Sequence, residues 1–240
     1  ATGNTSTSSH WLKHHLIIIM RTLAIGDIHG SCNALKTLSE YVGFESDDVI
    51  VTLGDYIDRG PDSKGVIDFL IELGKTHKLV TLKGNHEVML ENAPLSEQEL
   101  YFWLYNGGDT AMASFGATDP FALKDQIPPV YWDFFKSCKS YHETNGHILV
   151  HAGLDPDVDP EDQDESFTLW QRIFDTQPHK SGKTIVCGHT PQHEGYPLVL
   201  DHAICIDTFA CRGGWLTCLD IDSGQYWQAS ETGETRQGTI

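Results

Sequence analysis

The 240-residue sequence predicts a single α/β domain that begins with a βαβαβ unit. From residue 21 onwards, apolar strand-like segments alternate with amphipathic helix-like segments, a pattern typical of parallel strands joined by helices. Each of the first three strand-like segments ends in a polar cluster that contains glycine. The chain is long enough to bury one large core. We therefore expect one domain over residues 20–229.

Hydrophobic periodicity locates the elements of the first half. The expected strands are 22–25, 48–53 and 79–82. The expected helices are 31–42, 63–73 and 86–90. In the first two helices, apolar residues three or four positions apart share one face. Ser63 is suited to cap the second helix, because a serine hydroxyl accepts a hydrogen bond from the backbone of the first turn.

The second half predicts a helical insertion followed by further strands. Aromatic-rich helical patterns place the insertion at about 96–140. The later strands are expected at 147–150, 184–186, 203–206, 216–221 and 226–229. The polar residues 230–240 are expected to form a frayed tail. Residues 1–19 are rich in Ser, Thr and His without periodicity, and we interpret them as a disordered leader or tag, because Met20 directly precedes the first strand.

Composition argues against several classes of protein. The formal net charge of −18 disfavours nucleic-acid and anionic-membrane partners, which usually require a basic face. Six cysteines without paired CxxC spacing indicate a reduced, cytoplasmic protein, which we expect to be a monomer. The segment 155–165 carries seven acidic residues and is interpreted as a solvated loop. Its alternative role is a gate that favours cationic peptides.

Polar clusters at the strand ends indicate a shared site. The clusters are GDIHG at 26–30, GDYIDRG at 54–60 and GNHE at 84–87. Their positions 27, 55 and 85 are spaced by about one βαβ unit each, so all three clusters should meet at the carboxyl edge of one sheet. One such cluster alone would be interpreted as a turn or helix cap. Three at matching strand ends favour a binding site.

Two histidines extend this site. His151 and His189 each lie where an apolar run gives way to a glycine-containing turn, although a lone histidine there would more often be a hydrogen-bonded core residue. The resulting candidate metal ligands are Asp27, His29, Asp55, Asn85, His151 and His189. Carboxylate, imidazole and amide ligands suit Mn, Fe or Zn better than calcium or a thiolate zinc site. A shared carboxylate would bring two ions to roughly 3.5–4 Å.

The ordered motifs resemble the phosphoprotein phosphatase family of the calcineurin-like metallophosphoesterases. LYNGG at 104–108, LWQR at 169–172 and IDT at 206–208 are similar to segments of its small bacterial and lambda-phage-type serine/threonine protein phosphatases. The resemblance implies a β-sandwich flanked by helices, with the βαβαβ unit as the metal-binding core. The chain departs from the pattern at Ala152 and at Phe209, where relatives often carry glycine.

The resemblance also implies residue roles. Two divalent ions, Mn with Fe or Zn as alternatives, would be bound through Asp55 as the bridge. The remaining ligands are Asp27 and His29 for the first ion, and Asn85, His151 and His189 for the second. A hydroxide bridging the ions would attack phosphorus directly. The other implied roles are His86 as general acid, Asp58 as its orienting partner, and Arg59 and Arg172 as phosphate-binding residues.

An extended backbone at 85–86 would point His86 away from Asn85 and towards the leaving group.

Three functions are compatible with these motifs. The leading hypothesis is an enzyme whose partner is a phosphorylated protein or peptide. It would hydrolyse phosphoserine and phosphothreonine, with phosphotyrosine as an additional substrate. The second is a dinucleoside polyphosphate hydrolase, and Asp58 and Glu87 favour the first over it. The third is a pseudoenzyme that binds phosphoproteins, which the complete ligand set and the retained His86 disfavour.

Overall fold

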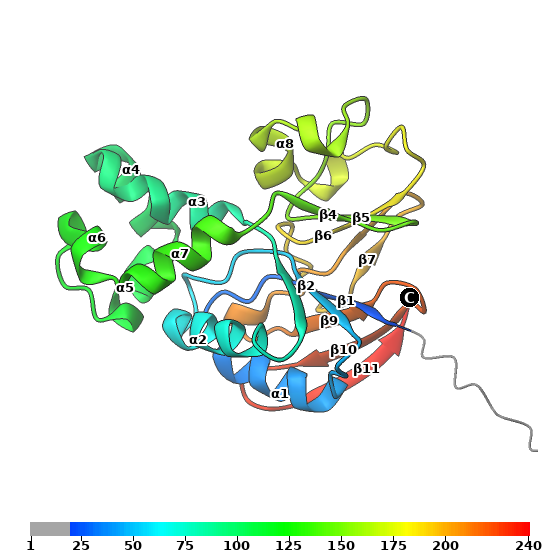
Figure 1. Ribbon diagram of the computed structural model, residues 1–240, viewed down its shortest axis with the longest axis horizontal. Coiled ribbons are helices and arrows are strands. Elements are labelled where there is room, and N and C mark those ends of the chain that lie inside the picture. Colours follow the sequence, from blue (N-terminus) through cyan, green and yellow to red (C-terminus); the bar gives the residue numbers. More distant parts are fainter. Residues whose placement is uncertain (1–19) are drawn as a thin grey trace, which may run out of the picture.

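The structure, a computed structural model, describes residues 20–240. The leader or tag expected at 1–19 lies outside the described residues. Two mixed sheets pack face to face, as predicted for a β-sandwich flanked by helices (Figure 1). Within the described part of the chain, no helix combines the length and apolar character needed to cross a bilayer.

The larger sheet contains the predicted βαβαβ unit. Its strand order is β11-β10-β9-β1-β2-β3, and β1, β2 and β3 are mutually parallel. Their bounds are β1 Thr22–Ile25, β2 Val49–Thr52, β3 Lys78–Thr81, β9 Leu216–Asp220, β10 Gln225–Ala229 and β11 Thr235–Thr239. Parallel register brings the carboxyl ends of the first three strands to one edge of the sheet.

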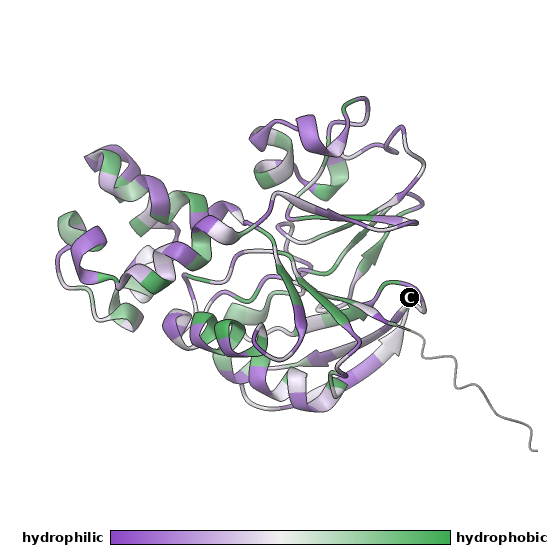
Figure 2. Cartoon of the chain, in the orientation of Figure 1, coloured by the Kyte–Doolittle hydropathy of each residue, from purple (hydrophilic) through white to green (hydrophobic). Residues whose placement is uncertain are grey.

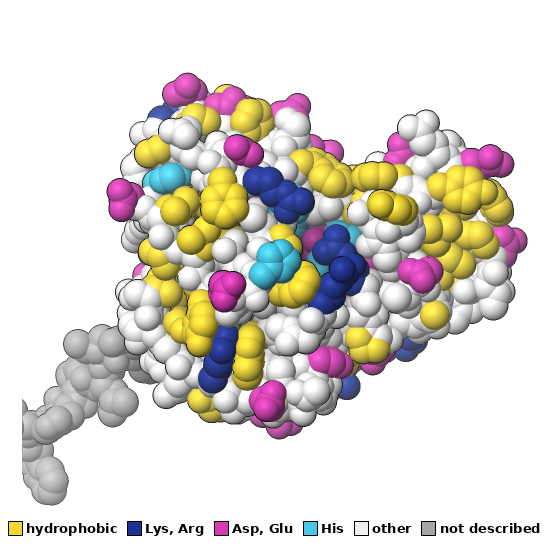
Figure 3. Space-filling model, turned by 180° about the vertical axis from the view of Figure 1, so that it is seen from behind, with side chains coloured by type: hydrophobic (Ala, Val, Ile, Leu, Met, Phe, Trp, Pro, Cys, Tyr) yellow, Lys and Arg dark blue, Asp and Glu magenta, His cyan; other side chains and the backbone are white. Residues whose placement is uncertain are grey.

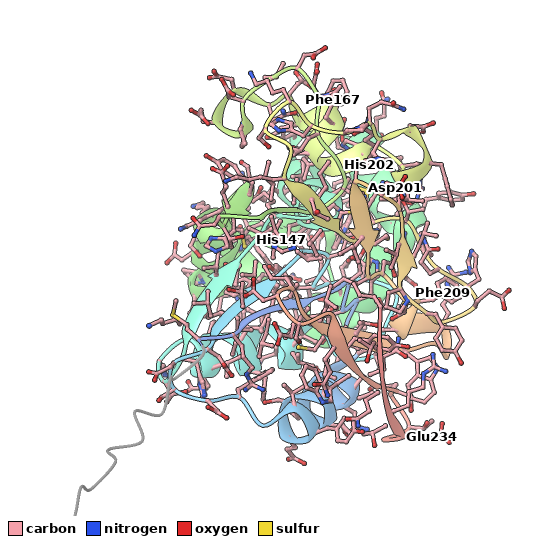
Figure 4. All side chains as sticks on the ribbon, turned by 90° about the vertical axis from the view of Figure 1, so that its right-hand side faces the viewer. His147, Phe167, Asp201, His202, Phe209 and Glu234 are labelled. Carbon is pink, nitrogen blue, oxygen red and sulfur yellow. The ribbon has the colours of Figure 1, made fainter. Side chains whose placement is uncertain are left out.

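The smaller sheet has the order β4-β5-β6-β8-β7, with β5, β6 and β8 parallel. Its bounds are β4 Tyr141–Glu143, β5 His147–Val150, β6 Thr184–Cys187, β7 Leu198–Val199 and β8 Ala203–Cys205. Figure 4 views this side of the molecule, with His147 at the start of β5 and His202 just before β8. Strands β4 and β7 were not predicted. They are only three and two residues long, so they carry too little periodicity to detect.

Helices cover both the larger sheet and the site edge. Their bounds are α1 Cys32–Val42, α2 Ser63–Leu73, α3 Asn85–Asn92, α4 Glu97–Trp103, α5 Asp109–Phe115, α6 Leu123–Gln126, α7 Pro129–Ser137 and α8 Glu165–Trp170. The expected cap of α2 is wrong: Oδ1 of Asp62 accepts the bond from Gly65 N (2.8 Å), and Ser63 is the first helical residue. Oγ of Ser63 instead accepts from the backbone N–H of Asp58 (3.0 Å).

Side-chain alternation along the strands produces separate apolar layers. Leu23 and Ile25 face α1 and α2, whereas Ala24 faces the smaller sheet. The layer between the sheets includes Val51 of β2 and Val186 of β6, both fully buried. Hydrophobic colour accordingly concentrates on the strands and on the inner faces of the helices (Figure 2). These layers stabilise the sheet edge on which the site is built.

The predicted insertion is helical. It contains α4 to α7, which lie beside α3 at one end of the molecule (Figure 1). Between α4 and α5 the chain forms a π-helical stretch, Leu104–Gly108, in which Gly107 has φ +104°. Glycine is suited to this position because a side chain there would be strained.

The frayed tail expected at 230–240 is wrong, because residues 235–239 form β11. This strand pairs antiparallel with β10 and reverses through a turn that contains Glu234 (Figure 4). The guanidinium of Arg236 lies between the rings of Tyr196 (4.3 Å) and Trp215 (4.2 Å) and donates to Gln228 Oε1 (2.6 Å). Backbone pairing and this stacking order a segment whose polar composition alone suggested fraying.

Candidate metal centre

The loops after β1 and β2 are joined to each other through backbone hydrogen bonds. The N–H groups of Ile28 and His29 both donate to the carbonyl of Asp55 (3.1 and 2.8 Å). His29 and Asp55 have left-handed φ values of +45° and +51°. Gly60 passes so close to the first loop that a Cβ there would lie 1.9 Å from His29 O. The glycine-containing motifs therefore allow two backbones to meet at the sheet edge.

Side chains of the first group converge on Asp55. Nε2 of His29 lies 3.4 Å from Asp55 Oδ2, and Nε2 of His86 lies 3.9 Å from the same oxygen. All three residues are buried, and one atom of each lies within 4.8 Å of the others. Asp27 does not join this group in the structure; both of its oxygens accept from the backbone N–H of His189 (3.2 and 3.0 Å).

The second group joins the two sheets. Asn85 Oδ1 lies 2.9 Å from Nε2 of His151 and 3.0 Å from Nδ1 of His189. The other ring nitrogen of His151, Nδ1, lies 2.9 Å from the carbonyl of Leu53 and must donate to it. Burial lowers the pKa of His151 to about 4, so the ring is neutral at pH 7 and Nε2 carries a lone pair.

The second group is therefore suited to bind a cation. The lone pair of His151 Nε2 faces Asn85 Oδ1 and, at 3.5 Å, Asp55 Oδ1, with no proton on Nε2 to join them. Electron-pair donors that converge in this way repel each other unless a cation lies among them. A histidine whose Nδ1 donates to a backbone carbonyl is also the usual arrangement for a metal ligand.

The buried carboxyl groups support the same conclusion. Burial raises the pKa of Asp55 to about 7. Burial, followed by the negative charges of Asp207 and Asp55, raises the pKa of Asp27 well above its usual value. Burial also raises the pKa of Asp207 to about 6. Ionised carboxylates are costly in such surroundings, and divalent cations would remove that cost. The donor set thus fits the two ions expected from the sequence.

His86 has a well-defined partner. Its Nδ1 lies 2.6 Å from Oδ2 of Asp58, and Nε1 of Trp103 donates to both Asp58 oxygens (3.1 and 3.0 Å). Desolvation by burial lowers the pKa of His86. The extended backbone expected at 85–86 is wrong. Gly84 is the N-cap of α3, and residues 85 and 86 are its first two helical residues, so their side chains diverge because of helical rotation.

A cavity of about 110 Å³ opens at the centre. Its lining residues are Asp55, Arg59, Asn85, His86, Asn106, Trp170, Arg172, His189 and Pro191. Nη1 of Arg59 lies 2.9 Å from His29 Nε2, and Nη1 of Arg172 donates to the carbonyl of His189 (2.8 Å). Lys and Arg side chains gather around a hollow in which Asp and His side chains are visible (Figure 3).

Three supporting residues were not assigned roles in the site from the sequence. Glu87 accepts from the N–H groups of Asp55 (2.9 Å) and Tyr56 (2.8 Å), which ties the second loop to the third. Asp207 adds a further buried carboxyl group. Both lie inside the short motifs GNHE and IDT, which could have pointed to them. Trp103 lies in the insertion, where no local signal predicts its contact with Asp58.

Comparison with known proteins agrees with this geometry. The family model for the calcineurin-like phosphoesterases matches residues 20–214. The chain is 34% identical to serine/threonine-protein phosphatase 1 of Salmonella typhimurium, over 82% of this chain and 90% of that protein. It is 29% identical to an asymmetrical bis(5'-nucleosyl)-tetraphosphatase of Anoxybacillus flavithermus, over 81% of this chain and 88% of that protein.

A solved structure described as a putative diadenosine tetraphosphatase has the same fold, with a TM-score of 0.62 and 20% identity over 93% of this chain and 95% of that one. The structure brings His29, Asn85, His151 and His189 together around Asp55 from the ends of strands in both sheets, and the family model covers all the residues predicted as ligands. The chain therefore belongs to the calcineurin-like phosphoesterases, a family of hydrolases with a binuclear divalent metal centre.

Proposed function

We propose that the protein hydrolyses phosphoserine and phosphothreonine in proteins or peptides. The observation that carries this proposal is the buried pair formed by His86 and Asp58, 2.6 Å apart. A poor leaving group such as a serine alkoxide needs a proton as it departs, and this pair can deliver one. The similarity to a serine/threonine-protein phosphatase over most of both chains supports the same substrate class. We also propose that manganese is the native metal and that the protein is a cytoplasmic monomer.

The metal ligands in this proposal are the residues predicted from the sequence. Asp27, His29 and Asp55 would bind the first ion, and Asp55, Asn85, His151 and His189 the second. When bound, the ions supply positive charge that acidifies water and stabilises the negative charge of the phosphoryl group. The backbone N–H groups at His86 and His189 orient Asp55 and Asp27 by donating to their carboxylates (3.1 and 3.0 Å).

The chain's own groups then bind phosphate and deliver the proton. Arg59 and Arg172 line the cavity and present planar guanidinium groups, which suit phosphate oxygens. Burial raises the pKa of Asp58 well above its usual value, so Asp58 can hold the proton of its bond to Nδ1 and leave a proton on Nε2 of the neutral His86 ring. Nε2 donates its proton to the leaving-group oxygen, while Nδ1 takes the proton of Asp58 in exchange. Asp58 in turn is oriented by Trp103. As the bond from phosphorus to this oxygen breaks, the proton therefore moves from Nε2 to the departing alkoxide oxygen, which leaves as a neutral alcohol.

A dinucleoside polyphosphate hydrolase is the second candidate. It is favoured by the similarity to an asymmetrical tetraphosphatase, which also extends over most of both chains. The same metal ligands and phosphate-binding arginines would serve that reaction. A non-catalytic phosphoprotein-binding role is disfavoured, because every candidate ligand and the general acid are present.

The test is a comparison of kcat/KM on three substrates with added Mn²⁺: a phosphoserine peptide, p-nitrophenyl phosphate and diadenosine tetraphosphate. We expect the phosphopeptide to be hydrolysed more efficiently than diadenosine tetraphosphate. The reverse order would overturn the proposal in favour of the nucleotide hydrolase. Inactivity on all three substrates in a purified protein without bound metal would support the pseudoenzyme.

A further inference from the structure

Three of the five arginines surround the site. Arg21 pairs with Asp48, and Arg236 lies between two aromatic rings. The other three are Arg59, Arg172 and Arg212. Among residues 20–240, none of these three forms a salt bridge. In a chain with a net charge of −18, arginines without an acidic partner indicate an anion-binding surface.

Arg212 belongs to a second cavity that adjoins the catalytic one. This cavity measures about 430 Å³ and is lined by Arg59, Tyr105, Asn106, Gly107, Thr110 and Arg212. Arg59 and Asn106 line both cavities, so the two share a wall. Of the residues that the structure describes, no acidic one lines the second cavity. Burial raises the pKa of the neighbouring Cys211 thiol to about 11, so this thiol adds no negative charge at pH 7.

The insertion fixes one wall of the second cavity. The backbone N–H of Arg59 donates to the carbonyl of Gly107 (3.2 Å), and a Cβ at Gly107 would lie 2.9 Å from Arg59 Cγ. Oγ1 of Thr110 donates to the same carbonyl (2.9 Å). The π-helical stretch thus contacts the backbone and the side-chain stem of Arg59, which lines both cavities.

The loop after β8 forms another part of the wall, which carries Arg212. Phe209, labelled in Figure 4, begins the turn with φ +67°. The centroid of its ring lies 4.5 Å from that of His193. The N–H of Gly214 donates to the carbonyl of Phe209 (3.1 Å) and closes the turn. The departure from glycine at position 209 therefore adds an aromatic contact to this loop. Arg212 is presented on an ordered turn.

We propose that Arg212, together with Arg59 and Asn106, forms a second anion subsite that binds a second phosphate of the substrate. This inference rests on the proposed function and names the substrate class more closely: molecules with two phosphates, one at the metal centre and one beside it. A second phosphoserine in a peptide and an adjoining phosphate of a nucleotide offer the same chemistry. Guanidinium groups without acidic partners are suited to either.

The test compares Arg212→Ala with Lys124→Ala, which removes the same charge from an exposed position on α6. The substrates are p-nitrophenyl phosphate, singly and doubly phosphorylated serine peptides, and diadenosine tetraphosphate, at one free Mn²⁺ concentration. Arg212→Ala should raise KM about tenfold for a two-phosphate substrate, the size expected for one charge-assisted contact. KM for p-nitrophenyl phosphate should be unchanged, and Lys124→Ala should change neither value.

The experiment also distinguishes the two sources of the second phosphate, a peptide and a nucleotide. A KM increase confined to the doubly phosphorylated peptide assigns the subsite to peptides, and one confined to diadenosine tetraphosphate assigns it to nucleotides. The inference is overturned if Arg212→Ala changes KM equally for one-phosphate and two-phosphate substrates, or for none. Calorimetric titration of the doubly phosphorylated peptide into His86→Asn, with and without Arg212→Ala, should show the same weakening without turnover.

Failure of the proposed function would look different. If p-nitrophenyl phosphate is hydrolysed but neither peptides nor diadenosine tetraphosphate are, the proposed function is wrong. The subsite is then judged by inhibition of p-nitrophenyl phosphate hydrolysis. Pyrophosphate that inhibits more strongly than phosphate in the wild type, but not in Arg212→Ala, supports the subsite. If wild type and Arg212→Ala show the same preference for pyrophosphate over phosphate, the subsite is overturned.

Discussion

The strand-end loops and the helical insertion differ in backbone conformation. Among residues 20–240, the non-glycine residues with positive φ are His29, Asp55, Asp58, Arg59, His189 and Phe209. The first five are candidate site residues, and the sixth begins the loop that carries Arg212. None lies in the insertion, where only Gly107 and Gly116 have positive φ. Each left-handed non-glycine residue costs about 1–3 kcal/mol.

This contrast shows where the sequence is constrained. In the loops, the backbone is held in costly conformations by hydrogen bonds such as those from Asp55 and Tyr56 to Glu87, so the ligand atoms have little freedom. The insertion uses ordinary helices and contributes to the centre mainly through Trp103 and the stretch around Gly107. Most candidate site residues therefore lie in strained loops, whereas the helices of the insertion supply part of the cavity walls.

The largest expected effect tests the catalytic role of a residue at the sheet edge, outside the insertion. His86→Asn should lower kcat on a phosphoserine peptide by about 10²–10⁴-fold, because the general acid is lost. Metal content, measured by elemental analysis, should remain at the wild-type value. The loss should be smaller for p-nitrophenyl phosphate, whose leaving group needs no proton. Full activity on the phosphopeptide would show that His86 is not the general acid.

A pair of glycine substitutions compares the two regions in stability. Gly60→Ala should lower the free energy of unfolding by more than about 3 kcal/mol, because its Cβ would meet the backbone carbonyl of His29 at 1.9 Å. The Cβ added by Gly116→Ala, in the insertion, would meet no atom within 4 Å. The free energy of unfolding should then fall only by the cost of an alanine at φ +73°, about 1 kcal/mol. Urea unfolding of both variants measures the difference. Equal losses would contradict the contrast between loops and insertion.

The smallest expected effect lies where the two regions meet. Trp103→Phe keeps most of the ring but removes the N–H that orients Asp58. Leaving this buried carboxyl group without its donor should lower the free energy of unfolding by about 1–3 kcal/mol. We expect kcat on the phosphopeptide to fall about tenfold, with little change in KM. Trp132→Phe is the control, since its N–H donates to Ile127 O (3.1 Å) within the insertion. If both variants lose stability but keep kcat, Trp103 is only structural.

Much of the site could be predicted because its residues follow strands in short glycine-containing motifs. The spacing of positions 27, 55 and 85 reflects the βαβ repeat, and parallel register turns that spacing into proximity. The contact of Trp103 with Asp58 spans 45 residues and follows no periodicity, so it required the structure. The second cavity was beyond prediction for the same reason, since it joins the insertion to the loop after β8.

Errors in the predicted fold have similar physical causes. The tail 230–240 is polar, and its order comes from pairing with β10 and from Arg236 stacking between two rings, both long-range contacts. The cap of α2 was placed one residue late, because aspartate and serine are both good caps and they are adjacent at 62 and 63. Local preference alone cannot decide between such neighbours.

The division of ligands between two sheets has a consequence for folding. Asp55 and Asn85 follow strands of the larger sheet, whereas His151 and His189 follow strands of the smaller one. The first and last of these four are 134 positions apart (189 − 55 = 134). Contacts of such high sequence separation close long loops and form slowly. During synthesis, the site proposed for the second ion can be completed only after residue 189 has emerged and the two sheets have docked.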